Sequence, residues 1–439
     1  MTDSNKIRVA FATAIGLGAI IGAGIFVLSG TAIAFAGADA ILAFILVGIV
    51  AIIIAFEYGE LGSIMPTLHG ATYSYVYKAF GSELGFITGI LLYASFAVSV
   101  SVIALGFGAY FVSLFNLTIN PIIIAIILIF ALSLVNLKGI KKAAKSDAFL
   151  VLIKVSILII FIIFAILFLL NSKATNILSN FSVKGNQGNL ESLIEAVIVI
   201  IFAYSGFQSI SSITPEVEGG AKSAAKAIIY SVAISMIIYV SVVVSLIILA
   251  PASKYSISGD PLAIALQSSS APQWLLILID FGALIATTSA TLAMILSSSK
   301  ILYQISEDKL LPKFFRLYDK KNGIAINGVI ITAIIAIITL FAGNIFVITS
   351  ISDFGLLFSY LITSFALIHF RRKKIEGSIK TPFYPYFPII SIIMIIIFMY
   401  GLPKESLLIG LIAVILLLTI YYSLREVENK KVIRIKLFK

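Results

Sequence analysis

Apolar runs of about 20 residues recur along this 439-residue chain from Ala10 to Tyr422. As a helix rising 1.5 Å per residue, each run is long enough to cross roughly 30 Å of hydrocarbon. The runs are continuous and lack the alternation of a barrel strand, so helices must satisfy the backbone within lipid. With 60% hydrophobic and 12% charged residues and a mean hydropathy of +1.13, the sequence predicts an all-α integral membrane protein.

The runs divide into twelve expected membrane-spanning helices, which place both chain ends on one side of the membrane. Their ranges are 9–36, 40–64, 83–114, 121–137, 146–170, 191–213, 223–250, 272–302, 324–342, 344–369, 383–401 and 405–423. Of the 31 Lys and Arg residues, 26 fall on the side of the termini, four fall on the opposite side, and Lys154 alone lies inside a span. Cytoplasmic loops carry such an excess, so we expect a multi-pass cell-membrane protein with both termini in the cytoplasm.

This topology accounts for the net charge of +11, so nucleic acid is not an expected partner. The N-terminus runs directly into a helix too long for a cleavable signal, and the first span is expected to stay in the mature protein. The chain has no Cys and two His residues far apart in sequence, so we expect neither a metal site nor a cofactor.

The first expected span contains five glycines, at positions 16, 18, 22, 24 and 30, although helix interiors normally avoid glycine. Packing through small residues explains Gly18 and Gly22, which are four positions apart, but not Gly24. The sixth expected span, "VIVIIFAYSGFQSISSITPE", is weakened by Ser205 and Gly206 at a similar depth. Two such breaks are expected of an inverted repeat of five helices, with the binding site between them.

The two ends of an interrupted helix attract opposite charges. Free N–H groups at a half-helix N-terminus attract an anion, and bare carbonyls at a half-helix C-terminus attract a cation. A zwitterion such as an amino acid would suit both.

Four stretches, in this order and spacing, resemble the amino acid-polyamine-organocation transporter family. They are "IIGAGIF" (20–26), "EYGELGSIMPTLHGATYSYVYKAFGSELGFITG" (57–89), "FAYSGFQSISSITPEVEGGAKSAAKAI" (202–228) and "SEDKLLPKFF" (306–315). The resemblance implies a secondary active transporter that works by alternating access. It implies a transport core in residues 1–370 with a leucine-transporter-type 5+5 inverted repeat, at about 9–170 and 191–370, and discontinuous helices 1 and 6. Residues 371–439 would form accessory spans 11 and 12 and a basic cytoplasmic tail.

The resemblance also implies the residues of the substrate site. The substrate carboxylate would be received by the backbone of Gly22, Ala23 and Gly24. The ammonium would be received by carbonyls near Ile20, Phe202, Ala203 and Ser205. The side chain of the substrate would lie against Ser95, Ser99 and Met294. The expected gate residues are Phe202, Phe207 and Glu216.

Two departures from the family pattern bear on the substrate. Gln208 stands where many relatives carry an acid, and Met294 stands where some arginine exchangers have a large aromatic residue. No carboxylate is left in the expected pocket to pair with a guanidinium, and an unpaired charge at bilayer depth is costly. We therefore expect a small or apolar neutral amino acid as the substrate.

Lys154 lies in "SDAFLVLIKVSILIIFIIFAILFLL", roughly 13 Å from the nearer membrane surface. Its side chain is too short to reach the headgroups, so it should face the bundle. In the resembled family some proton-coupled members carry a lysine here, where sodium-coupled relatives bind an ion. The resemblance implies that the ammonium lies beside the Gly18 backbone and the hydroxyls of Thr288 and Ser289, and that protonation of Lys154 couples transport to a proton. The alternative is a permanently charged lysine that does not titrate.

Of the acids that lie inside expected spans, four bear on the mechanism. Glu57 and Glu60 lie near the cytoplasmic end of the second span, where a gate or packing role is expected. Asp280 and Asp353 lie one to two turns inside the extracellular side. Either could serve a proton entry route, but a satisfied, water-exposed carboxylate is the favoured interpretation.

Three alternatives to proton symport stay open. An amino acid exchanger without net proton coupling would share these motifs. A channel would need a pore, usually built by oligomer symmetry, whereas this chain has one site between two broken helices. An enzyme is not expected, because the sequence has no GxSxG, no HExxH and no mid-span carboxylate pair at helical spacing.

Overall fold

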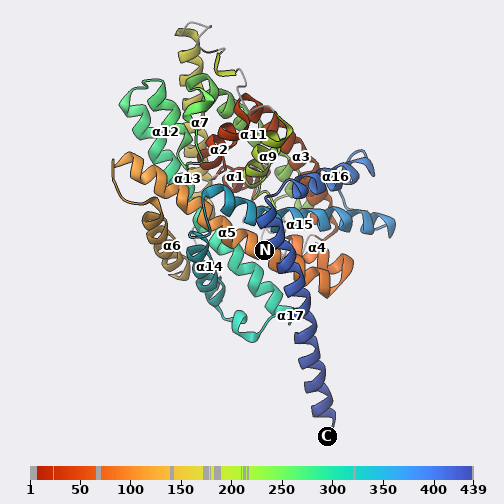
Figure 1. The fold of residues 1–439 in the computed structure, drawn as a ribbon. Coiled ribbons are helices and arrows are strands. Elements are labelled where there is room, and N and C mark those ends of the chain that lie inside the picture. The colour runs from red at the N-terminus through yellow and green to blue at the C-terminus, as the bar shows by residue number, and fades with distance from the viewer. Residues whose placement is uncertain are drawn as a thin grey trace.

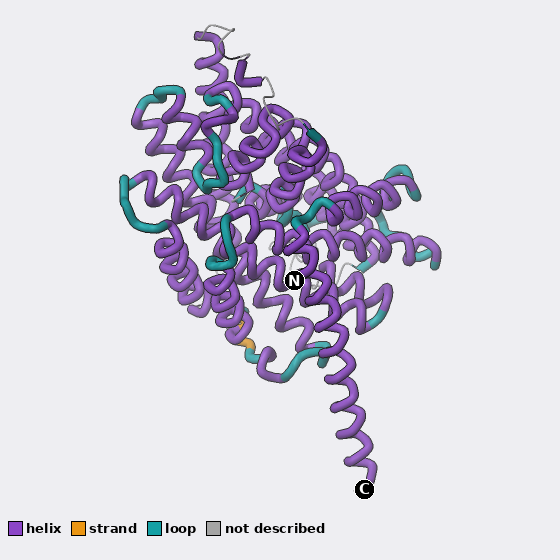
Figure 2. Tube along the Cα trace, viewed as in Figure 1, coloured by secondary structure: helices purple, strands orange, loops and turns teal. Residues whose placement is uncertain are grey.

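The computed structural model describes residues 7–22, 24–65, 71–138, 143–171, 177, 179–181, 189–208, 210, 214, 217–319 and 323–437. The described chain is almost entirely helical, with one two-residue strand pair (Figure 2). Among the described residues, eight helical stretches are long and apolar enough to cross a membrane. The predicted all-α membrane class is confirmed.

The first expected span is divided in the structure. It consists of α1 (Val9–Ile20), the π-helical turn η2 (Gly24–Leu28) and α2 (Ser29–Ala36). The 3-10 turn η3 (Gly37–Asp39) then leads into α3 (Ala40–Ile64). Gly37 has φ of +57°, a left-handed conformation that ends α2.

The remaining helices follow along the chain as α4 (Ala71–Phe80), α5 (Ser82–Leu114), α6 (Pro121–Lys138), α7 (Ala143–Asn171), α9 (Leu190–Ala203), α11 (Gly220–Leu249), α12 (Pro261–Ser268), α13 (Gln273–Glu307), α14 (Ile326–Thr339), α15 (Ile345–Arg372), α16 (Tyr386–Tyr400) and α17 (Lys404–Leu437). Three 3-10 turns, η4 (Ser179–Phe181), η6 (Ala252–Lys254) and η7 (Lys313–Arg316), lie between helices. The strands β1 (Tyr318–Asp319) and β2 (Ile324–Ala325) pair antiparallel.

Helix α5 lies near the middle of the bundle and packs on α6, α13 and α15 (Figure 1). Helix α11 packs on α3 and α1, and α7 packs on α1, α11 and α13. Close approach is possible because small residues lie at the contacts. A Cβ built on Gly355 of α15 would lie 2.4 Å from the Leu91 carbonyl oxygen of α5.

The structure has helices that the span ranges did not include. Helix α4 occupies part of the connection between the second and third expected spans and packs on α5 and α15. Helix α12 lies between α11 and α13 and begins with Pro261, a residue suited to a first helical turn. Helix α17 continues beyond the expected end at residue 423 to Leu437 and projects away from the bundle (Figure 1).

Candidate substrate site at two interrupted helices

The first helix break lies at the predicted glycines. Helix α1 ends at Ile20, and the carbonyl oxygen of Ile20 accepts from the Gly22 N–H at 2.8 Å instead of continuing the helical pattern. The chain resumes as a helix at Gly24. Ala23, an expected carboxylate-binding residue, lies outside the described residues.

The second break begins where α9 ends, at Ala203. The carbonyl oxygen of Phe202 accepts from the Ser205 N–H at 3.0 Å and from the Ser205 hydroxyl at 2.8 Å. Gly206 has φ of +110°, a conformation that side chains rarely adopt, and its N–H donates to Gln208 Oε1 at 2.9 Å. Gln208 therefore shapes the break itself.

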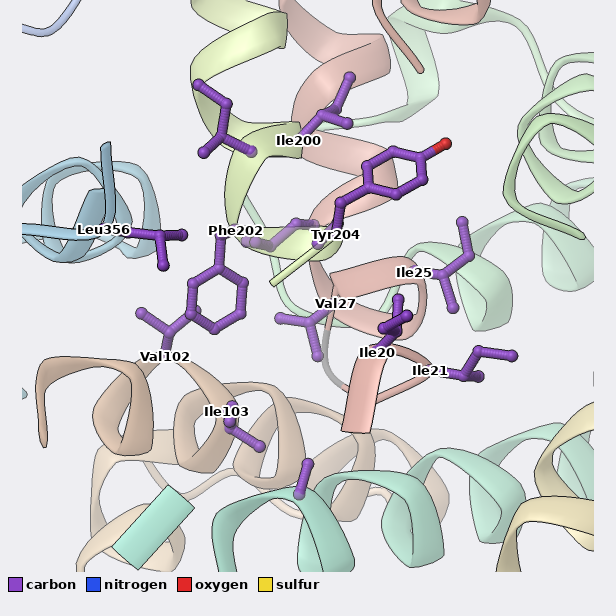
Figure 3. Packing of buried hydrophobic residues seen from close by; sticks show 14 of the residues in the cluster. Ile20, Ile21, Ile25, Val27, Val102, Ile103, Ile200, Phe202, Tyr204 and Leu356 are labelled. Carbon is purple, nitrogen blue, oxygen red and sulfur yellow. The ribbon is translucent and has the colours of Figure 1, made fainter. Parts of the chain in front are cut away.

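The two breaks touch each other. A Cβ built on Gly24 would lie 2.4 Å from Ala203 Cα, and one built on Gly206 would lie 2.6 Å from the Ala19 carbonyl oxygen. Figure 3 shows the end of α9 beside this part of the first helix, with the Phe202 ring directed towards Val102 of α5. The predicted juxtaposition of first and sixth spans therefore holds in these residues.

Tyr239 of α11 joins the two breaks, and sequence reasoning missed it. Its buried hydroxyl donates to the carbonyl oxygen of Ile20 at 2.6 Å and to that of Ala203 at 3.1 Å. These oxygens belong to the C-terminal ends of two different half-helices, so both ends direct their partial negative charge to one point. In the sequence Tyr239 is one tyrosine in the apolar run "ISMIIYVSVVV", with nothing to separate it from a packing residue.

The expected side-chain pocket residues take up different positions. Ser95 and Ser99 of α5 direct their hydroxyls to α15, where Ser95 donates to the Ser352 carbonyl oxygen at 2.5 Å and Ser99 Oγ lies 3.0 Å from Ser352 Oγ. Met294 of α13 is buried one turn beyond Ala290, whose Cβ lies 2.8 Å from a Cβ built on Gly22. Met294 is therefore near the first break.

The two expected aromatic gates are both buried, and Phe207 lies against two tyrosines. Its ring centroid is 5.5 Å from that of Tyr58 and 5.8 Å from that of Tyr360. A small apolar cavity of about 20 Å³, partly open to its surroundings, lies here between α3, α9, α15 and α16. Phe207 and Tyr360 line it together with Tyr204, Leu357 and Phe398. The third expected gate residue, Glu216, lies outside the described residues.

Lys154 of α7 is 2% exposed, whereas Leu152 of the same helix is 63% exposed. The residues one turn before and one turn after Lys154, Val151 and Ile157, show which helices this face of α7 contacts. A Cβ built on Gly18 of α1 would lie 2.4 Å from Val151, and one built on Gly282 of α13 would lie 2.6 Å from Ile157. Lys154 thus lies on the face of α7 that packs on α1 and α13.

The hydroxyls expected beside Lys154 are partly engaged within their own helix. Ser289 donates to the Ala286 carbonyl oxygen at 3.2 Å, and Thr288 is half-buried. Both precede Ala290, the residue of α13 that approaches Gly22. Gly18 lies on α1, and Thr288 and Ser289 lie on α13. These two helices pack against the face of α7 that carries Lys154.

The intramembrane acids are more buried than expected. Glu57 accepts from the hydroxyls of Ser364 at 2.5 Å and Ser391 at 2.6 Å, and Glu60 pairs with Arg371 at 2.6 Å. Asp280 is 4% exposed and Asp353 is 0% exposed. The favoured expectation of water-exposed carboxylates is wrong for both, because the neighbouring helices cover them.

Two interrupted apolar helices whose carbonyl ends converge inside a multi-span bundle define the class, a helical membrane transporter. A family model described as amino acid permease matches residues 9–423, so the chain belongs to that family. The predicted family resemblance is confirmed, and the chain is a multi-pass membrane transporter rather than an enzyme.

Two relatives agree with this assignment, and a solved structure shares the fold. The chain is 31% identical over 415 residues to the methylthioribose transporter of Bacillus subtilis, covering 89% of this chain and 87% of that protein. It is 28% identical over 439 residues to the branched-chain amino acid permease BcaP of Lactococcus lactis, covering 95% and 94%. The solved manganese transporter of Eremococcus coleocola has a TM-score of 0.61 at 15% identity, covering 98% of this chain and 96% of that chain, which shows a shared fold alone.

Proposed function

We propose that this protein is a proton-coupled symporter of neutral amino acids that works by alternating access. The observation that carries the proposal is the meeting of the Ile20 and Ala203 carbonyl oxygens at one hydroxyl, inside a bundle of the amino acid permease family. An amino acid ammonium carries three donors and a full positive charge, so it suits this carbonyl pair better than one phenol does.

The proposed architecture has twelve spans in a 5+5 inverted repeat plus two accessory helices, with both termini in the cytoplasm. In this arrangement α7 is the last span of the first repeat and α15 is the last span of the second. The breaks at Gly22 and Ser205 then occupy corresponding helices of the two repeats, which supports a substrate site between them.

A neutral substrate is supported by the composition of the breaks. Residues 17–22, 24–28 and 200–208 contain no Asp or Glu that could pair with a cationic side chain. The surroundings are instead apolar, with Ile21, Ile25 and Phe202 all buried. The similarity to BcaP adds branched-chain amino acids as the first substrates to test.

Proton coupling through Lys154 is supported by its burial between two helices that carry the site. An ammonium at this depth is costly unless it is well paired, so its charge should depend on which neighbours surround it. Protonated Lys154 would hold α7 to α1 and α13, and loss of the proton would loosen that contact and let substrate leave.

Purified protein in proteoliposomes tests this function. An inward gradient of about one pH unit should accumulate leucine up to about tenfold if one proton accompanies each leucine. Lys154→Ala should abolish that accumulation but keep leucine counterflow, because the carbonyl site is intact. Lys254→Ala, which changes an exposed loop lysine, is the matched control and should behave like wild type. Undiminished proton-driven accumulation by Lys154→Ala would remove the proposed role.

A second candidate substrate is methylthioribose, because the relative that transports it is 31% identical to this chain. Its hydroxyls could donate to the same carbonyl pair, but it has no carboxylate. A thermal-shift screen separates the candidates, since a ligand at 100 times its Kd stabilises the bound state by about 2.7 kcal/mol. Exchange without proton coupling is separated from symport by uptake into vesicles that contain no internal substrate.

A further inference from the structure

Asp353 of α15 stands out among the buried polar groups. Its side chain is 0% exposed, and neither carboxylate oxygen has a hydrogen-bond partner among the described residues. The neighbouring Ser352, by contrast, is bonded to Ser95 and Ser99 of α5. The carboxylate of Asp353 thus lies in the bundle without the donors that normally accompany a buried anion.

Two residues on the face of α15 that carries Asp353 line the cavity beside Phe207. Leu357 and Tyr360 lie four and seven positions further along α15, so they share a face of the helix with Asp353. Both line the cavity.

This environment favours a carboxylic acid over a carboxylate. Burying an ionised carboxylate without a partner is strongly unfavourable, whereas the protonated acid carries no net charge. A metal cation would need several oxygen ligands, and the described residues contain no cluster of three acidic, His or Cys side chains that could hold one. The chemical species that satisfies this site with least reorganisation is therefore a proton.

Asp353 also corresponds in position to Lys154. Lys154 lies about three turns into α7, and Asp353 lies just over two turns into α15. In the proposed repeat these helices are the last spans of the two halves and run in opposite directions. The basic Lys154 therefore lies about a third of the way along the last span of the first half. The acidic Asp353 lies at a similar depth in the last span of the second half, counted from the other side of the membrane.

We propose that Asp353 is a second proton-binding site, which takes up a proton from the extracellular side and releases it towards the cytoplasm when the cavity beside Phe207 admits water. This rests on the proposed function. In the closed arrangement Asp353 holds the proton as a neutral acid, and opening of the cavity at Leu357 and Tyr360 hydrates the carboxylate and releases it. Each transport cycle then moves one proton on Asp353 in addition to the proton on Lys154.

Other titratable groups do not supply a partner within the described residues. The helices packed on α15 carry Glu57, Tyr58 and Glu60 on α3; Tyr73, Tyr75, Tyr77 and Lys78 on α4; Glu83, Tyr93 and Tyr110 on α5; Glu191 and Glu195 on α9, with Tyr204 after it; Tyr386 and Tyr400 on α16; and Lys404, Glu405, Tyr421 and Tyr422 on α17. Helix α15 itself carries Tyr360, His369, Arg371 and Arg372. Glu57 and Glu60 are bonded to Ser364 and Arg371, two turns or more towards the cytoplasmic end.

The pH dependence of thermal stability tests proton binding without any substrate. Asp353→Asn imitates the protonated acid, so full-length wild type should lose stability relative to this variant as pH rises from 5 to 8. The ratio of folded to unfolded wild type, relative to the variant, should fall by up to about tenfold per pH unit. Glu405→Gln, an exposed acid near α15, is the matched control and should show no such trend. A pH profile of Asp353→Asn parallel to wild type overturns the proposal.

Proteoliposomes loaded with a pH-sensitive dye test the transport role, with leucine as the substrate. Asp353→Asn should keep leucine counterflow and move about half as many protons per leucine as wild type. An unchanged ratio, or loss of counterflow as well, overturns the proposal. If wild type moves leucine without protons, the proposed symport fails, while the stability profile still decides whether Asp353 binds a proton. Stabilisation of wild type but not Asp353→Asn by NaCl over KCl would identify sodium instead and overturn the proton.

Discussion

The Tyr239 hydroxyl donates to two buried carbonyl oxygens, one at the end of α1 and one at the end of α9. Its bonds to Ile20 and Ala203 are 2.6 and 3.1 Å long. A buried acceptor left unsatisfied costs about 1–3 kcal/mol, so Tyr239→Phe should lower the free energy of unfolding of the substrate-free protein by about that amount. An ammonium can supply the missing donor, so leucine should stabilise Tyr239→Phe more than it stabilises wild type. Thermal unfolding with and without leucine measures both effects.

A second tyrosine provides the control for this prediction. The Tyr255 hydroxyl donates to the Leu246 carbonyl oxygen at 2.7 Å, outside the helix breaks. Tyr255→Phe should therefore cost similar stability, while the additional stabilisation by leucine stays at the wild-type value. Equal leucine effects in the two variants would contradict a role of the Ile20 and Ala203 carbonyls in binding the substrate.

At the residue scale the glycines could be predicted and their partners could not. Gly22, Gly24 and Gly206 are unusual within their own helices, because glycine disfavours a helix interior wherever that helix packs. Tyr239 and Ser352 are ordinary residues of their helices. Their roles depend on which helix lies beside them, and a single sequence with local periodicity does not contain that information.

At the element scale, an ion pair connects the C-terminal ends of α3 and α15. Arg371 of α15 lies 2.6 Å from one oxygen of Glu60 and 3.1 Å from the other, and the Thr381 N–H donates to Glu60 at 2.6 Å. Glu60 is 0% exposed. The sequence predicted a gate or packing role for Glu60 but not its partner Arg371, which lies two residues beyond the end of the tenth expected span.

Removing the arginine should therefore destabilise the contact between these two helices. Arg371→Ala leaves a buried carboxylate without its cation, a change that typically costs about 3–5 kcal/mol. Denaturant unfolding in detergent measures this cost. Faster leucine release towards the cytoplasmic side should accompany it, since α3 and α15 would separate more easily at that end.

The exposed neighbour of this pair provides a contrast. The Lys380 ammonium bonds to Glu376 and, together with Arg371, lowers the pKa of the Glu376 carboxyl. An acid whose pKa is lowered in the folded state stabilises that state at pH values above its ordinary, unfolded-state pKa. This stabilisation is lost as the pH falls through the folded-state pKa. Because the pair is solvent-exposed, Lys380→Ala should have little measurable effect on unfolding. A loss as large as that of Arg371→Ala would contradict the distinction between the buried and the exposed pair.

At the scale of the whole molecule, the apolar runs predicted the helical bundle because hydrocarbon forces every span to satisfy its own backbone. The same rule does not apply to segments outside the hydrocarbon, so it could not predict α4, α12 or the continuation of α17. It also could not place Asp353, whose burial results from helices that pack around α15 in the folded chain.

The orientation of the molecule is the last property that the charge pattern predicts. The chain has no cysteine, so single cysteines report position without background. Ser256 is exposed between α11 and α12, on the expected extracellular side, and Ser378 is exposed between α15 and α16, on the expected cytoplasmic side. A membrane-impermeant maleimide added to intact cells should label Ser256→Cys and should label Ser378→Cys only after permeabilisation. The reverse pattern would contradict the assignment, because 26 of the 31 basic residues would then lie outside the cell.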